Sequence, residues 1–314
     1  MAEAAAALKR LGAGALRLGP VGRAARSIGA ARGRALALVY HRITPDDPGP
    51  AAIVPWVRED LFRRHVQTLG ELGDVVPLEE LLHRPGGRRK LRFALTFDDD
   101  YESHAGQVLP VLRSAGVRGT FFLSGRSLHG LGPYWFESLE RLLQTHPLEQ
   151  VARMLGIAGG TAEQLALACE RDLRHQHRLE QTADAPAGQL AAEQIAMLAA
   201  GSTVGFHTLH HRVLTALPDE ALERELTEGT EALAAVTGQP LRLFAYPHGK
   251  GDGKVAARVR AAGYAAAWTG VPNPARAGAD PFLLGRWEPG ALSVDELLVK
   301  VAIRLNRTRP AVPA

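Results

Sequence analysis

The sequence of 314 residues contains a single cysteine, Cys169. One cysteine can form no disulfide within the chain, and it cannot supply the cysteine clusters found in many structural zinc sites. Any metal site in this sequence must therefore be built from histidine and carboxylate side chains.

Long apolar runs are also missing. Nowhere do about 18 consecutive apolar residues occur, so the sequence predicts no transmembrane helix. Within residues 1–35, scattered arginines and glycines interrupt the apolar core of roughly 7 to 15 residues that a secretory signal needs. We therefore expect a cytoplasmic protein, with the membrane face of the cytoplasm as the alternative place of action.

The segment 1–35 is rich in alanine and arginine, and Glu3 is its only acid. Two interpretations of this segment stay open. It is either a basic amphipathic helix that makes peripheral contact with an anionic membrane surface or a partner, or an ordinary alanine-rich helix or frayed tail.

Aromatic side chains and an excess of charge of one sign are both scarce. Aromatic residues make up 6% of the chain, and the formal net charge is only +4. Proteins that bind nucleic acid concentrate basic charge on one face or interleave it with aromatics, so we expect no nucleic-acid partner. The 46% of hydrophobic and 22% of charged residues are typical of a globular protein.

From residue 36 onward, short apolar runs alternate with helical periodicity. Apolar runs typical of buried strands occur at 36–40, 92–97, 119–123, 202–206, 241–246 and 265–268. Helical patterns lie between them at 62–72, 78–82, 105–115, 218–236 and 254–262. Asp60 is the predicted N-cap of the first of these helices. Repeated β/α units of this kind predict an α/β fold with a parallel sheet or barrel.

The strand rhythm is lost between residues 127 and 196, where the pattern is helical. We therefore predict a helical insertion at about 127–196 within a β/α domain that spans 36–290. A C-terminal helix and a loose tail are expected at 291–314.

Three consecutive acids, Asp98, Asp99 and Asp100, directly follow the apolar run at 92–97. The carboxyl ends of parallel strands are where β/α folds place their functional groups. Taken alone, such acids are equally well explained by a helix cap or a solvated turn.

His207 and His211 follow another apolar run and stand four residues apart. On the first turn of a helix, this spacing would place both imidazoles on one face, where they can share one metal ion. Two histidines and one carboxylate leave a coordination position open for water, as expected of a hydrolytic divalent-metal site. A third motif, at 244–249, ends a strand in a Pro and Gly turn that directs His248 to the same rim.

Taken together, these motifs resemble the polysaccharide deacetylases with a NodB-homology domain, the carbohydrate esterase family 4 type. The resemblance covers about 36–286 without the insertion. It is carried by Thr96-Phe97-Asp98-Asp99, Gly119-Thr120-Phe121-Phe122, His207-Thr208-x-x-His211 and Tyr246-Pro247-x-Gly249, in that order. It implies a distorted (β/α) barrel with fewer than eight repeats, a divalent metal, and hydrolysis of an N-acetyl or O-acetyl group on a sugar. Zinc is the first choice of metal, with cobalt, nickel or manganese as alternatives.

The resemblance also implies roles for individual residues. Asp98 would be the general base, and Asp99, His207 and His211 would hold the metal. The backbone N–H of His248 would stabilise the oxyanion, and the turn at Tyr246 and Pro247 would contact substrate.

The chain departs from the common family pattern at the general acid, because the segment 284–287 lacks the usual histidine. The Tyr40-His41 pair at the end of the first strand makes His41 our choice of acid, with His248 as the alternative. Ala245 stands where many members have an arginine that orients the catalytic aspartate, and Arg286 is the candidate to replace it.

Asp100 stands where the family usually has glycine. It would add a metal ligand, repel an anionic substrate or only require a permitted backbone angle.

Several aromatic residues are candidates for stacking on a sugar, and core packing explains each equally well. Trp287, which follows Arg286, is the first choice. The others are Tyr134, Trp135, Phe136 and Trp268.

The expected function is removal of an acetyl group from a carbohydrate, such as an N-acetylated glycan or a lipid-linked or nucleotide-linked sugar. Two alternatives remain. One is a metal amidohydrolase that acts on a small non-glycan amide, and the other is a carbohydrate-binding protein of the same fold that has lost turnover.

Overall fold

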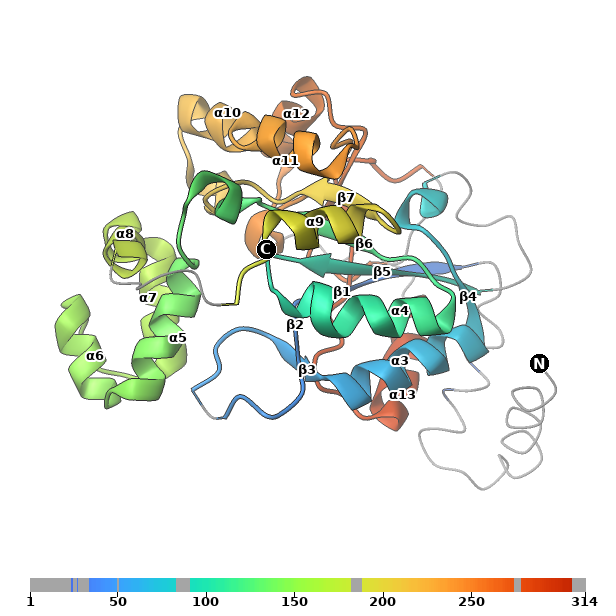
Figure 1. Cartoon of the computed structure of the whole chain (residues 1–314), viewed down its shortest axis with the longest axis horizontal. Helices are drawn as coiled ribbons and strands as arrows, with labels where there is room; N and C mark the ends of the chain where they lie inside the picture. The colour runs from blue at the N-terminus through green and yellow to red at the C-terminus, as the bar shows by residue number, and fades with distance from the viewer. Residues whose placement is uncertain are drawn as a thin grey trace.

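The computed structural model describes residues 34–49, 51–82, 91–181, 188–273 and 278–306, together with Ala24 and Ser27. Its centre is a parallel sheet that curls into a nearly closed barrel (Figure 1). In spatial order its strands are β1 (Ala35–Tyr40), β5 (Leu91–Asp98), β6 (Thr120–Leu123), β7 (Thr203–Phe206), β8 (Leu243–Ala245), β9 (Ala266–Thr269) and β10 (Leu284–Gly285). The predicted distorted (β/α) barrel is thus confirmed.

Contacts just beyond β10 bring the last strand back to the first. The backbone N–H of Val39 donates to the carbonyl of Trp287 at 3.0 Å, and the N–H of Trp287 donates to the carbonyl of Ala37 at 3.0 Å. All residues of β1 and β5 are buried, as expected for strands covered on both faces. Because every strand pair is parallel, the carboxyl ends of the strands meet at one rim.

Four short strands, including the two-residue β10, escaped the sequence pattern because two or three residues are too few to show periodicity. β4 (Gly73–Val75) pairs with β5, and β2 (Arg42–Thr44) pairs with β3 (Trp56–Arg58) in a separate ribbon. The predicted helix at 78–82 is the 3-10 turn η1 (Leu78–Leu81).

Helices surround the barrel in the order expected of β/α units (Figure 1). They are α3 (Glu59–Leu72), η2 (His104–Val108), α4 (Leu109–Ala115), α9 (Ala192–Ala199), η4 (Leu214–Ala216), α10 (Asp219–Thr227), α11 (Thr230–Thr237), η5 (Pro247–Gly249), α12 (Gly253–Ala261) and α13 (Val294–Asn306). Their apolar faces pack on strand residues such as Leu36, Leu38 and Phe93 in the main core, while alternate strand residues such as Ala35 and Ala37 belong to a second cluster.

Two helix predictions need correction. The N-cap of α3 is Arg58, with Asp60 inside the first turn, where its negative charge suits the helix dipole. The predicted helix at 218–236 is divided into α10 and α11, because Gly229 adopts a φ of 87° between them.

The insertion packs beside the barrel as a small helical subdomain (Figure 1). It follows η3 (Arg126–His129) and comprises α5 (Trp135–Thr145), α6 (Leu148–Leu155), α7 (Ala162–Arg171) and α8 (Leu173–Gln181). These helices enclose a core of their own that includes Leu139, Val151 and Cys169. α9 belongs to the barrel instead, since Ile195 and Leu198 lie in the main core, so the insertion is shorter than its sequence pattern indicates.

Buried polar contacts join the insertion to the barrel. On α5, Glu140 accepts hydrogen bonds from the Arg42 side chain at 2.6 Å and from the backbone N–H groups of Ile53 at 2.8 Å and Val54 at 3.2 Å. On α8, Glu180 pairs with Arg212 at 3.2 Å. Because these charged pairs are largely buried, they fix the position of the insertion against the barrel more firmly than surface ion pairs would.

No helix among the described residues is both long and apolar enough to cross a membrane. Nearly all of the basic segment 1–35 lies outside the described residues, and so does the tail at 307–314. Peripheral membrane contact and a cytoplasmic location stay predictions.

Candidate active site

Five strand ends place polar side chains around one pocket on the carboxyl rim of the barrel. His41 follows β1, Asp99 follows β5, His207 follows β7, His248 follows β8 and Arg286 follows β10. The pocket has a volume of about 470 Å³, which is ordinary for a small-molecule site. The loop at 53–55 and helices of the insertion supply its remaining wall.

The backbone is strained at this rim. Among the described residues, the non-glycine residues with positive φ are Asp99 (71°), Thr208 (61°), His211 (52°) and His248 (57°). All four belong to the loops that follow β5, β7 and β8. Left-handed backbone is unfavourable for residues with a Cβ and concentrates at functional sites, where surrounding contacts hold it in place.

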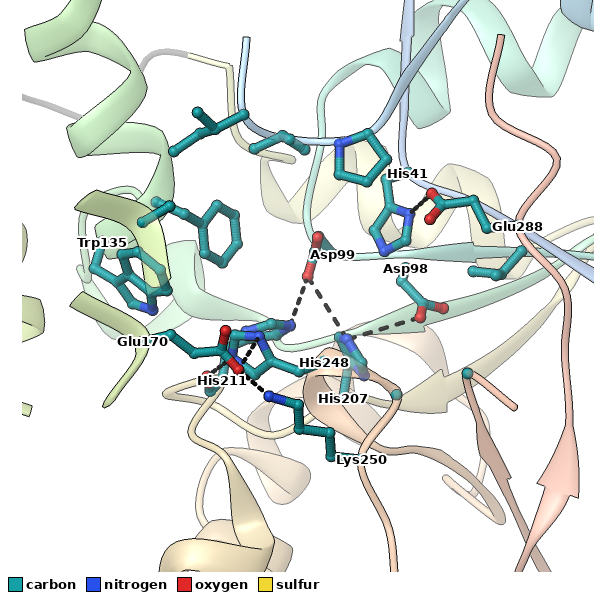
Figure 2. A pocket seen from close by; sticks show the side chains of 18 of the residues that line it. His41, Asp98, Asp99, Trp135, Glu170, His207, His211, His248, Lys250 and Glu288 are labelled. Carbon is teal, nitrogen blue, oxygen red and sulfur yellow. Dashed lines mark hydrogen bonds and ion pairs between the residues drawn. The ribbon is translucent and has the colours of Figure 1, made fainter. Parts of the chain in front are cut away.

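Asp99, His207 and His211 form a buried triad whose ligand atoms lie within 4.8 Å of one another. The Asp99 Oδ1 atom is 3.7 Å from His207 Nε2 and 3.4 Å from His211 Nε2. Dashed lines in Figure 2 mark both contacts. The His207 Nδ1 atom is 2.9 Å from the carbonyl oxygen of Ala245. That contact fixes the Nδ1–H tautomer and leaves Nε2 as a lone-pair donor toward Asp99.

The two histidines do not stand on a helix, contrary to the expectation from their spacing. Residues 207–213 form an irregular loop. In this loop the backbone N–H of His211 donates to Thr208 Oγ1 at 3.1 Å, and the left-handed residues Thr208 and His211 turn the chain back on itself. Both rings are therefore brought to the rim by a turn that the Thr208 hydroxyl caps, and not by a helix. His210 pairs with Glu228 instead, with its Nε2 atom 3.4 Å from the carboxylate.

The protonation states of the triad suit a cation. Burial lowers the pKa of His207 to about 4 and that of His211 well below its usual value, so both rings are neutral near pH 7. Burial raises the pKa of Asp99 to about 8, and its Oδ1 atom has no hydrogen-bond partner. A cation at this point would favour the ionised carboxylate, so the donor set fits a divalent metal of the kind that neutral imidazole and carboxylate bind.

Asp98 lies beside the triad and is held by Arg286. The guanidinium donates to both carboxylate oxygens, with NH1 to Oδ1 at 2.6 Å and NH2 to Oδ2 at 2.7 Å. It also donates to Thr96 Oγ1 at 3.1 Å. Burial alone would raise the pKa of Asp98, but the Arg286 charge and then His207 lower it to about 2. The structure thus brings Arg286 to the position where an orienting arginine was expected.

His41 lines the same pocket, on the side of Asp98 that faces away from His207 (Figure 2). Its Nδ1 atom is 2.8 Å from Glu288 Oε1. Burial opposes the charged ring, but the Glu288 carboxylate, with smaller contributions from Asp99 and Asp98, raises the pKa of His41 to about 9. His41 therefore carries a proton near pH 7.

His248 lies on the insertion side of the triad. Its Nε2 atom is 3.3 Å from the carbonyl oxygen of His211, and its ring is roughly parallel to that of Trp135, with centroids 6.4 Å apart. Burial lowers the pKa of His248, although Glu170 at 3.7 Å from its Nδ1 opposes this effect. A neutral His248 is a poorer proton donor than the charged His41.

Asp100 is a structural residue in this chain. Its carboxylate accepts hydrogen bonds from the backbone N–H groups of Ser124 at 2.9 Å and Arg126 at 2.9 Å. It does not belong to the triad of candidate ligands. Its position therefore agrees neither with binding of the metal nor with contact to the substrate, which were two of the three explanations for an aspartate in place of the family's glycine.

The structure does not place Tyr246, Pro247 and Trp287 in the pocket, and this corrects their assignment to substrate. Tyr246 is buried and donates its hydroxyl to the carbonyl of Phe282 at 2.7 Å, and Pro247 is buried in the turn beside it. Trp287 packs in the main core, with the Arg304 guanidinium over its ring. The sequence shows only that these residues follow strands. It does not show that their side chains point into the core and not into the pocket.

Of the other aromatic candidates, Trp135 and Phe136 line the pocket. Tyr134 is buried against the His211 ring, with centroids 5.3 Å apart, and Trp268 is buried among strand residues of the barrel.

Four charged residues of the pocket were missed: Glu163, Glu170, Lys250 and Glu288. Glu288 had a usable signal, because it stands two residues beyond Arg286 on an extended segment and so shares its face. Glu170 and Lys250 had none, since α7 and the loop after β8 meet only in the folded chain.

The model of the polysaccharide deacetylase family matches residues 86–267. Among curated proteins, none matches the chain.

Similar folds occur among solved structures. A Streptococcus pyogenes deacetylase, PplD, in complex with acetate is 17% identical, with a TM-score of 0.59 over 85% of this chain and 97% of that one. IcaB from Ammonifex degensii is 21% identical, with a TM-score of 0.58 over 87% and 97%. A de-N-acetylase from Aggregatibacter actinomycetemcomitans is 14% identical, with a TM-score of 0.57 over 86% and 99%. At these identities the likeness concerns the fold.

Proposed function

The chain belongs to the polysaccharide deacetylase family, which makes it a carbohydrate N-deacetylase, and we propose that it depends on a divalent metal, with zinc as the first candidate. The observation that carries this proposal is the buried triad of Asp99, His207 and His211 next to the arginine-held Asp98. Asp99, His207 and His211 would hold the ion. Such an ion lowers the pKa of a water molecule and polarises an acyl carbonyl.

Asp98 is the proposed general base. Arg286 holds its carboxylate in a single orientation by two short hydrogen bonds, so no side-chain entropy is lost when the reaction begins. It can take a proton from the water that attacks the acyl carbon. Arg286 also compensates the charge that would otherwise make this buried carboxylate costly.

His41 is the proposed general acid. Because Glu288 keeps its ring protonated near pH 7, His41 can donate a proton to the leaving nitrogen as the C–N bond breaks. The products are acetate and the free amino group on the sugar. The neutral His248 is left with a positioning role, in which its backbone N–H faces the developing oxyanion.

The decisive experiment measures acetate release from N-acetylated oligosaccharides, nucleotide sugars and glycolipids. Metal-stripped protein is compared with protein reloaded with zinc, cobalt, nickel or manganese. We expect acetate only with metal, and a loss of about 10²-fold to 10⁴-fold in kcat for Asp98→Asn, which removes the base. Metal content is expected to stay unchanged in this variant, because Asp98 is not in the triad.

Asp295→Asn is the matched control, since Asp295 is exposed on α13 far from the pocket. Acetate release without metal, or equal turnover by Asp98→Asn, would contradict the proposal. Tight metal binding without acetate from any sugar would favour a small amide substrate or a binding role instead.

A further inference from the structure

The pocket has two chemically different walls. One wall carries the charged groups of the barrel rim, such as His41, Asp98 and Glu288. The other is apolar and combines a loop of the barrel with two helices of the insertion. Its side chains are Ile53, Val54, Pro55, Phe136, Ala166 and Leu167.

The six apolar side chains of this wall offer a sugar no hydrogen-bonding group, and the carboxylates that flank them on α7 belong to Glu163 and Glu170. The backbone N–H groups of Ile53 and Val54 already donate to Glu140, and Pro55 has no N–H. Ala166 and Leu167 lie within α7, where backbone groups bond along the helix. Hydroxyl groups placed here would lose their bonds to water without replacement, whereas an apolar group would gain free energy by leaving water.

The charged groups of the pocket argue against a phosphate. Each cationic side chain among the described residues that line it is already paired with a carboxylate: Arg286 with Asp98, His41 with Glu288, and Lys250 with Glu170. Asp99 and Glu163 add two further acids. A nucleotide diphosphate would meet this surplus of carboxylates without an unpaired cation to bind it.

We propose that the substrate is an N-acetylated sugar that carries an apolar aglycone, and that the wall of Ile53, Val54, Pro55, Phe136, Ala166 and Leu167 binds this aglycone. The proposal rests on the proposed deacetylase function, because the sugar must present its acetamide to the triad. The insertion would then determine the substrate, while the barrel rim supplies the chemistry.

The wall is held in position before any substrate binds. Glu140 ties α5 to the loop that carries Ile53 and Val54, and Glu170 on α7 pairs with Lys250 from the loop after β8. Figure 2 shows Glu170 next to Lys250, with Trp135 beyond it. Because these contacts already hold the wall in place, its side chains and loops lose little conformational entropy when a substrate binds.

The test compares the methyl and octyl glycosides of N-acetylglucosamine with zinc-loaded protein, below the concentration at which the octyl glycoside aggregates. Calorimetry measures the Kd of each, and acetate release measures KM. We expect the octyl glycoside to bind at least about tenfold more tightly, because its alkyl chain leaves water at the wall.

Leu167→Gln and Leu173→Gln form a matched pair of variants. Both leucines are on insertion helices and are exposed to a similar extent, at 43% and 44%, but only Leu167 lines the pocket. We expect Leu167→Gln to lose most of the preference for the octyl glycoside and Leu173→Gln to keep it. The methyl glycoside should bind all three proteins alike.

Equal binding of the two glycosides, binding of neither, or a preference that survives Leu167→Gln would overturn the proposal. So would tighter binding of a methyl glycoside with an N-octanoyl group in place of N-acetyl, since this would assign the wall to the acyl chain. A clear octyl preference without acetate release from any substrate would support the wall and refute the deacetylase function, so the two failures are distinguishable.

Discussion

Charged side chains at the rim occur in pairs, and each pair sets the behaviour of one residue. Arg286 makes Asp98 a fixed carboxylate, and Glu288 makes His41 a protonated imidazole. Both partners come from the segment that directly follows β10. One short segment of the chain therefore prepares both the proposed base and the proposed acid.

The pairing of His41 with Glu288 predicts the alkaline limit of activity. The pKa of His41 is raised, so its charge is complete at neutral pH and is lost as the pH rises through about 9. We expect kcat/KM to fall on this side, and Glu288→Gln to move the fall by about one pH unit or more toward lower pH. Asp98 and Asp99 also face His41 and are unchanged in this variant, so part of the shift remains.

A pH profile of acetate release by the two proteins measures this effect. Glu296→Gln, on the exposed face of α13, is the control and should keep the profile of the wild type. An alkaline limb that stays in place in Glu288→Gln would exclude His41 as the acid.

At the scale of elements, loops after the strands position the site by adopting backbone angles that most residues avoid. The loop after β8 shows the clearest packing reason. Gly249 has a φ of 66°, and a Cβ added there would lie 2.6 Å from the backbone nitrogen of Gly270, in the loop after β9. Two neighbouring loops of the rim thus touch through their backbones, which only glycine permits.

Gly249→Ala is expected to destabilise the protein more than Gly130→Ala. Both glycines have nearly the same φ, 66° and 64°, but a Cβ at Gly130 would meet nothing within 4 Å. Gly130→Ala therefore costs only the left-handed backbone penalty of about 1 to 2 kcal/mol. Gly249→Ala adds the clash with Gly270, and the difference in the free energy of unfolding, measured in urea, should exceed about 1 kcal/mol.

Because the Gly249 loop also carries His248, Gly249→Ala should lower kcat as well, and Gly130→Ala should not. Equal losses of stability in the two variants would show that the loops move apart without cost.

At the scale of the whole molecule, the candidate site joins parts of the chain that are stabilised separately. The barrel and the insertion each have a core of their own, and the pocket lies where they meet. The triad adds a cross-connection within the barrel, since Asp99 follows β5 and both histidines follow β7. Without a cation, it leaves a buried carboxylate oxygen without a hydrogen bond.

Bound metal should therefore reverse the effect of Asp99→Asn on the stability of the protein. In metal-free protein at pH 7, Asp99→Asn is expected to be as stable as the wild type or more so, because it removes a carboxyl group whose charged form burial disfavours. With zinc at about 100 times its Kd, the wild type gains about 2.7 kcal/mol from binding to the folded state alone.

Thermal unfolding with and without zinc, followed by circular dichroism, tests this. Zinc should raise the Tm of the wild type and of the exposed control Asp295→Asn, and should leave that of Asp99→Asn nearly unchanged. A zinc-dependent rise of equal size in Asp99→Asn would place the metal elsewhere.

The order of strands and the identity of the candidate ligands could be predicted from the sequence because both depend on local pattern. Mostly apolar runs such as 92–97 mark strands buried on both faces, and the polar residues that end them must lie at the rim of a parallel sheet. Asp98, Asp99 and His207 were found in this way. The geometry of His211 was not, because its turn depends on Thr208 and not on helical spacing.

The sequence named Arg286 as a candidate partner of Asp98, but only the tertiary structure showed this pair and added Glu288 as the partner of His41. Arg286 and Asp98 are 188 positions apart, and Glu288 and His41 are 247 apart, so no local pattern links them. Closure of the barrel brings β10 next to β1 and creates both pairs. The same holds for the apolar wall, because docking of the insertion on the barrel brings Leu167 and Ile53 to the same wall of one pocket. Local periodicity thus determined where the chemistry lies along the chain, and long-range packing decided what surrounds it.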